Sequence, residues 1–164
     1  MALIKKIGYG QVEPNHLSAQ RNGQIYAQLP CATGIDTLEN GQFVKYDYAA
    51  GNCNFTGNGE FMLVFNEIKL YDERKQGYKD FAVHTSEMND GKIYPRVFKT
   101  MVGDIFTTNT FETEIELVAG DKLIVGAKGF LVAGEAVAGQ PLFQVAKVYT
   151  LADGQPAVKV QRIA

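Results

Sequence analysis

The side chains that most often carry catalysis are scarce in this sequence, which has two histidines, His16 and His84, and two serines, Ser18 and Ser86. His84 and Ser86 are two residues apart, so on a strand they would share a face, an arrangement that invites pairing of a nucleophile with a base. Side chains at that spacing run parallel rather than meeting, and no Gly-x-Ser-x-Gly turn surrounds Ser86. We therefore interpret the pair as part of a solvated loop.

Candidate metal ligands are equally dispersed. A histidine-based site needs clustered ligands, and His16 and His84 lie far apart in the sequence. Glu112, Glu114 and Glu116 alternate along one predicted strand and together could hold a divalent cation. A solvated strand face whose charges prevent edge-to-edge pairing is the simpler interpretation. We expect no metal, no cofactor and no catalytic residue, and hence a protein that is not an enzyme.

Two cysteines, Cys31 and Cys53, lack the Cys-x-x-Cys spacing of metal and redox motifs. They could form one disulfide or remain as two buried thiols. The N-terminal residues 1–8 contain a basic pair but no apolar stretch of signal-peptide length. We therefore expect synthesis in a cytoplasm, where thiols stay reduced, and two free thiols.

A short turn phrase recurs between the elements that must position these side chains. It consists of Asn or Asp, then Gly, then a polar residue. Asn-Gly and Asp-Gly favour the positive φ angles of a type I′ hairpin turn, so each copy predicts a turn that leads into a strand. The five copies begin at Asn22, Asn40, Asn58, Asp90 and Asp153.

Strand patterns lie between these turns. Residues 42–48 alternate between apolar and polar, which predicts a half-buried strand. Residues 61–65 are apolar throughout and predict a central strand covered on both faces. Pro95 interrupts a strand predicted over 93–98 and places it at an edge or a bulge. No segment shows a sustained helical period, so the fold class is all-β.

The chain length of 164 residues suits one domain. Residues 1–34 contain two prolines and few core-forming residues, which predicts an extended N-terminal arm with one early strand. Residues 35–164 then form a single β domain, a small β-barrel or sandwich built from hairpins. Within it, the very polar stretch 72–92 predicts one long surface loop.

The charge distribution argues against nucleic acid as a partner, and the hydropathy argues against a membrane. The formal net charge is -2, and the Lys and Arg residues are dispersed rather than gathered into the basic patch that a phosphate backbone requires. The longest unbroken apolar run, residues 61–65, is far shorter than a membrane span.

The segment Val102–Thr110, followed by Gly120–Val125 and glycine-rich hairpins up to Phe143, resembles the small β-rich virion proteins of tailed bacteriophages, especially capsid decoration (cement) proteins. The resemblance covers roughly the C-terminal two-thirds of the chain and rests on turn-and-strand phrasing. It implies a viral structural protein on the capsid exterior, made in the host cytoplasm. Such a protein binds the lattice of the major capsid protein and bridges its subunits as a homo-oligomer, for example a trimer.

Under this resemblance the N-terminal arm crosses a subunit boundary. Leu3, Ile4, Ile7 and Tyr9 place apolar side chains ahead of the globular part, with little local core to enter. We therefore predict that these four residues form a protein interface. The stretch 72–92 does not match the family's pattern, which leaves a head fibre base or a tail tube as alternative locations in the virion.

Two hypotheses from other classes remain open. A carbohydrate- or receptor-binding β module would gather Tyr71, Tyr78 and Phe81 on one loop cluster. A small β-barrel enzyme would hold two carboxylates with shifted pKa values in a concave pocket.

Overall fold

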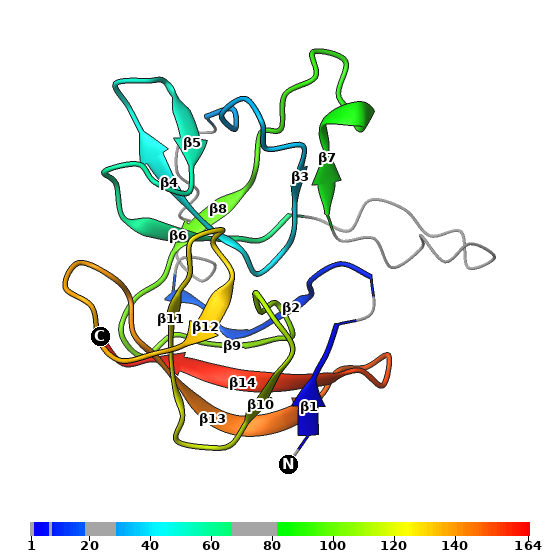
Figure 1. Cartoon of the computed structure of the whole chain (residues 1–164), viewed down its shortest axis with the longest axis vertical. Helices are drawn as coiled ribbons and strands as arrows, with labels where there is room; N and C mark the ends of the chain where they lie inside the picture. Colours follow the sequence, from blue (N-terminus) through cyan, green and yellow to red (C-terminus); the bar gives the residue numbers. More distant parts are fainter. Residues whose placement is uncertain (1, 7, 19–28, 67–81) are drawn as a thin grey trace.

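The computed structural model describes residues 2–6, 8–18, 29–66 and 82–164. The protein is nearly all β, as predicted, and a short 3-10 turn, η2 (Thr85–Glu87), interrupts the strands (Figure 1). The strands are β1 (Ala2–Ile4), β2 (Val12–His16), β3 (Thr37–Leu38), β4 (Phe43–Asp47), β5 (Asn52–Asn54), β6 (Phe61–Val64), β7 (Val83–His84), β8 (Val97–Lys99), β9 (Ile105–Thr108), β10 (Ile115–Leu117), β11 (Lys122–Val125), β12 (Leu131–Ala133), β13 (Phe143–Thr150) and β14 (Pro156–Arg162).

A six-stranded antiparallel sheet in the order β12-β11-β13-β14-β9-β2 forms the lower half of the molecule in Figure 1. Its centre is the long hairpin β13–β14, and the pair β1–β10 lies beside it. Phe106 and Phe143 project from this sheet into the first of two hydrophobic cores, with ring centroids 5.6 Å apart.

A four-stranded sheet in the order β5-β4-β6-β8 lies above it and is covered on both faces. Phe43 and Leu63 point into the first core, whereas Val44 and Met62, the next residues along the pairing, point into the second. Side chains of a strand alternate between its faces, so a run that is apolar throughout suits a sheet buried on each side. The prediction for residues 61–65 is confirmed.

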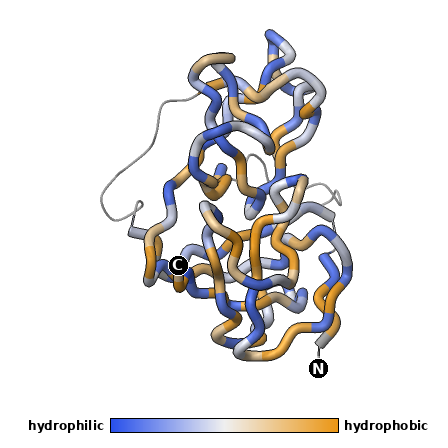
Figure 2. Tube along the Cα trace, turned by 60° about the vertical axis from the view of Figure 1, so that its left-hand side comes forward, coloured by the Kyte–Doolittle hydropathy of each residue, from blue (hydrophilic) through white to orange (hydrophobic). Residues whose placement is uncertain are grey.

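The second core is closed by shorter elements. The two-residue strands β3 and β7 pair with each other, and Leu38 and Val83 from them are buried against the four-stranded sheet. Irregular segments that carry Leu29 and Ile93 complete the cover. Apolar stretches run through both halves of the molecule (Figure 2).

The sheets are layered, and none of those formed by the described residues closes on itself. Of the two predicted architectures, the sandwich is therefore the one observed. In the predicted loop 72–92, residues 72–81 lie outside the described residues, and the remainder is not all loop, because Ala82 and Val83 are buried and Val83 belongs to β7.

The prediction of an extended arm over residues 1–34 is wrong for the parts that the structure describes. Strand β1 pairs with β10, and β2 pairs with β9 at the edge of the six-stranded sheet. Ile4 and Leu17 are 1% and 2% exposed and belong to the first core. A few inward-facing apolar residues suffice to hold these strands, so the low apolar density of the segment concealed them.

Four copies of the turn phrase lie in described residues, and the copy at Asn22 does not. Strands β4, β6 and β14 begin two residues after Gly41, Gly59 and Gly154, as predicted. After Asp90 the chain stays irregular until β8, which begins at Val97 rather than at residue 93.

The turns are not of type I′. Within the described ranges every residue with positive φ is a glycine, including Gly41 and Gly154, whereas a type I′ turn needs two consecutive residues in that region. Gly59 does not have positive φ and is required for another reason. A Cβ at this position would lie 2.7 Å from the Tyr46 carbonyl oxygen, so the close approach of two backbones selects glycine.

Candidate functional site

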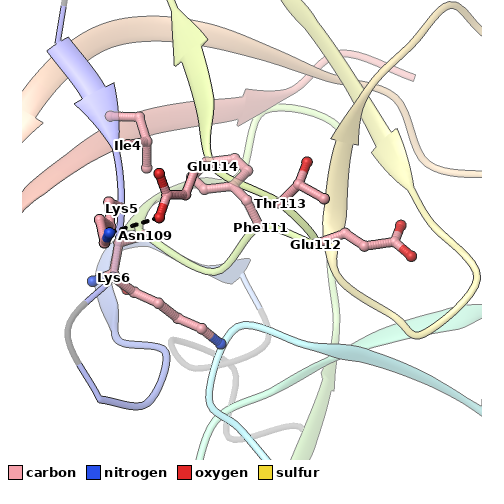
Figure 3. A pocket seen from close by; sticks show the side chains of 8 residues that line it. All are labelled: Ile4, Lys5, Lys6, Asn109, Phe111, Glu112, Thr113 and Glu114. Atoms are coloured by element: carbon pink, nitrogen blue, oxygen red, sulfur yellow. Dashed lines mark ion pairs between the residues drawn. The ribbon is translucent and has the colours of Figure 1, made fainter.

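A pocket of about 280 Å³ lies next to the N-terminal strand (Figure 3). It lies between the end of β1 and the connection from β9 to β10. The lining residues are Ile4, Lys5, Lys6, Asn109, Phe111, Glu112, Thr113 and Glu114.

Both lysines of the pocket already have carboxylate partners. Lys5 Nζ lies 2.8 Å from Glu114 Oε1, and the hydrogen bond to that carboxylate, together with its charge, raises the pKa of Lys5. Lys6 forms an ion pair with Glu39, which also accepts a hydrogen bond from the Gly10 amide. The pocket therefore has no cation reserved for a ligand anion.

The two glutamates of the pocket do not act as a carboxylate pair. Glu114 points toward Lys5, whereas Glu112 points to the other side of the chain (Figure 3). The expected strand through residues 111–117 is shorter than predicted, because a bend at 112–113 limits β10 to Ile115–Leu117. In the part of the chain that the structure describes, no three His, Cys, Asp or Glu side chains gather as a metal site.

His84 and Ser86 do not form a catalytic dyad. His84 lies in β7, where its Nδ1 is 3.0 Å from Thr37 Oγ1 and its ring meets the edge of Tyr9 at a centroid distance of 5.1 Å. Ser86 is exposed in η2. The prediction of a solvated loop is therefore wrong for His84, which helps to attach β7 to β3. His16 belongs to β2.

The four predicted interface residues have different environments. Leu3 is 46% exposed, as an interface residue should be. Ile4 is 1% exposed within the protein's own core, so its assignment to an interface is wrong. Tyr9 is partly buried against His84, and Ile7 lies outside the described residues. The cause is strand alternation, which turns adjacent residues of β1 to opposite faces.

The outer face of the β1–β10 pair combines apolar and charged side chains. Leu3 lies opposite Glu116 in the register, and Lys5 reaches Glu114 just beyond the paired residues. Val118, directly after β10, is 41% exposed. Among the described strands, β1 and β10 form a hydrogen-bonded ladder only with each other, and β14 packs close to β1 without bonding to it.

A buried polar network was not predicted. Residues 107–110, Thr-Thr-Asn-Thr, are at most 1% exposed. Asn109 accepts a hydrogen bond from the Gln11 amide (3.0 Å) and donates one to Gln155 (3.2 Å), while Thr110 Oγ1 donates to the Asn40 carbonyl (2.9 Å). Two of these bonds satisfy backbone groups, those of Gln11 and Asn40, next to the end of β9. The sequence feature that could have indicated this network is the run of four small polar residues at the end of a strand.

The comparisons with known proteins do not identify a relative. No family model matches the chain, and no curated protein or solved structure matches it. No helix among the residues described here has the length and apolar character needed to cross a membrane.

Proposed function

We propose that this chain is a capsid decoration protein of a tailed bacteriophage, which binds the outside of the capsid lattice and bridges subunits of the major capsid protein. The proposal starts from the resemblance of residues 102–110 and 120–143 to such proteins and agrees with an all-β fold. The observation that carries it is the exposed outer face of the β1–β10 pair, which forms no ladder with a third described strand.

This pair is suited to strand addition by a partner. An isolated pair of short strands is marginally stable, but Ile4 and Leu117 anchor this one in the first core. Strand β10, which bonds only to β1 among the described strands, therefore presents its second edge on a fixed support. Backbone hydrogen bonds at such an edge provide affinity, and the outward side chains provide specificity.

Leu3 is the apolar contact of this surface. Complete burial of a leucine contributes roughly 1.5 to 3 kcal/mol, so burying the 46% of Leu3 that is exposed contributes about 1 kcal/mol. That is small for a single contact. Many copies in a symmetric assembly multiply its effect, because each bound site raises the effective concentration at the next.

The test is Leu3→Asp with Val137→Asp as the matched control. Val137 is also 46% exposed, but it lies in the loop between β12 and β13, away from β1 (Figure 1). Capsids lacking the protein are incubated with each variant and the bound copies are counted by quantitative mass spectrometry. We expect Leu3→Asp to lower occupancy at least tenfold and Val137→Asp to leave it unchanged, with both variants folded.

Equal occupancy for the wild type and Leu3→Asp would contradict this use of β1. Labelling intact virions with antibodies against the recombinant protein separates the remaining virion locations. Label over the capsid supports decoration, and label confined to the tail or to fibres supports the alternatives. Tyr71, Tyr78 and Phe81, which would mark a glycan- or receptor-binding module, lie outside the described residues.

A further inference from the structure

The two cysteines, which we predicted to be free thiols, lie against each other. Cys31 Sγ is 3.5 Å from Cys53 Sγ, although 22 positions separate the two residues in the sequence. Cys53 is fully buried in the second core, and Cys31 is partly exposed at its rim. Cys31 is therefore the cysteine closer to solvent, and a reagent would reach Cys53 past it.

The backbone holds the two cysteines as neighbours. Cys31 and Cys53 form an isolated parallel bridge, in which the Cys53 amide donates to the Pro30 carbonyl and the Ala32 amide donates to the Cys53 carbonyl, each at 2.8 Å. Residues paired in this way have Cα atoms about 5 Å apart. A disulfide needs about 4.4 to 6.8 Å, so bond formation requires side-chain rotation and little backbone movement.

The bridge fastens an irregular segment to a sheet edge. Cys31 also donates its amide hydrogen to the Ile93 carbonyl at 2.8 Å, so residues 30–32 lie between β5 and Ile93. Leu29 and Ile35 on the same segment pack on the second core. A covalent link at Cys31 would hold this cover in place.

We propose that Cys31 and Cys53 form an oxidation site, at which a low-molecular-weight disulfide such as oxidised glutathione converts the two thiols into an intramolecular disulfide. The proposal rests on this contact and does not depend on the proposed function.

The reaction proceeds by two exchanges. The Cys31 thiolate attacks one sulfur of the small disulfide, which forms a mixed disulfide and releases one small thiol. The Cys53 thiolate then attacks Cys31 Sγ and releases the second small thiol. Two protein thiols are oxidised and one small disulfide is reduced to two thiols, so electrons and protons balance.

Folding and the new bond should stabilise each other. Closing a loop of this length restricts the unfolded chain enough to raise Tm by on the order of 10 °C. By linkage, the disulfide should be harder to reduce in the native protein than in the unfolded one. The [GSH]²/[GSSG] value at which half of the disulfide is reduced should be on the order of 100-fold higher for native than for urea-unfolded protein.

The experiment equilibrates native and urea-unfolded protein in glutathione buffers, followed by acid quenching and mass spectrometry. We expect the native protein to lose about 2 Da, from the two hydrogens removed, and to yield a linked peptide pair containing Cys31 and Cys53. Cys53→Ala should stop at a glutathione adduct on Cys31, and Cys31→Ala should stay unmodified while folded because Cys53 is buried.

Three results would overturn the proposal. In the first, the native protein keeps both thiols alkylatable under conditions that oxidise the unfolded chain. In the second, wild-type protein accumulates only the Cys31 adduct. In the third, the disulfide forms but lowers Tm, which would show that the native backbone does not accommodate it.

Discussion

The two faces of the four-stranded sheet are covered in different ways. The first core lies between two regular sheets, and the rings of Phe43, Phe106 and Phe143 contact one another within it. The second core is covered by the two-residue strands β3 and β7 and by irregular segments. Short elements with few ladder hydrogen bonds open at lower free energy than long sheets do. We therefore expect the first core to supply most of the stability and the second core to have the more adaptable cover.

A matched pair of core truncations tests this difference between the two cores most directly. Leu123 and Leu38 are both fully buried, the first between sheets and the second under β3–β7. We expect Leu123→Ala to lower the free energy of unfolding by about 4 kcal/mol and Leu38→Ala by about 2.5 kcal/mol, because the looser cover can collapse around the smaller side chain. Urea denaturation measures both, and equal losses would contradict the difference between the cores.

A second pair of substitutions, in β1, tests where the first core ends. Ile4 and Leu3 are adjacent in β1 but face inward and outward. We expect Ile4→Ala to lower the free energy of unfolding by about 3 kcal/mol and Leu3→Ala to lower it by less than about 0.5 kcal/mol. Thermal unfolding of the two variants provides the check. If Ile4→Ala left the stability unchanged, the N-terminal segment would be the extended arm that the sequence predicted.

The smallest effect concerns the rim of the second core. The hydrogen bond with Cys53, then burial, then the charge of Cys53 raise the pKa of Cys31. Tyr46 packs nearby, and burial raises its own pKa to about 12, so it stays neutral over the same range. A raised pKa leaves less thiolate at a given pH. Alkylation of Cys31 should therefore be slower than for an ordinary thiol at pH 8 and should keep rising above pH 9.

The control for this pH dependence is Cys53→Ala, which removes the largest cause of the raised pKa. Cys31 in that variant should react faster than in the wild type at pH 8. A wild-type alkylation rate that levels off near pH 8.5, as for an unperturbed cysteine, would show that the contact with Cys53 does not hold the proton.

Elements that depend on a short stretch of neighbouring residues were predicted correctly from the sequence. The phrases at Asn40, Asn58 and Asp153 correctly placed the starts of three strands, and the uninterrupted apolar run 61–65 predicted a doubly covered strand. The predicted turn type, I′, was wrong, because the asparagine or aspartate before each glycine keeps negative φ.

Long-range pairings escaped prediction because their partners are distant in the sequence. Strand β1 has three residues, and its pattern does not specify β10 as its partner. The same holds for Cys31 and Cys53, whose spacing was compatible with a disulfide or with two buried thiols and did not reveal the parallel bridge between them. At the candidate site, Leu3 is exposed and stays a predicted interface residue, whereas the inward orientation of Ile4 depended on that unpredicted pairing.

The most direct test of the proposed function is the copy number of this chain in purified virions, measured by quantitative mass spectrometry against the major capsid protein. Decoration predicts many copies in a constant ratio to the capsid protein, and the loss of that ratio when Leu3→Asp replaces the wild type. Absence from virions, or the few copies typical of a tail or fibre component, would contradict a capsid decoration protein.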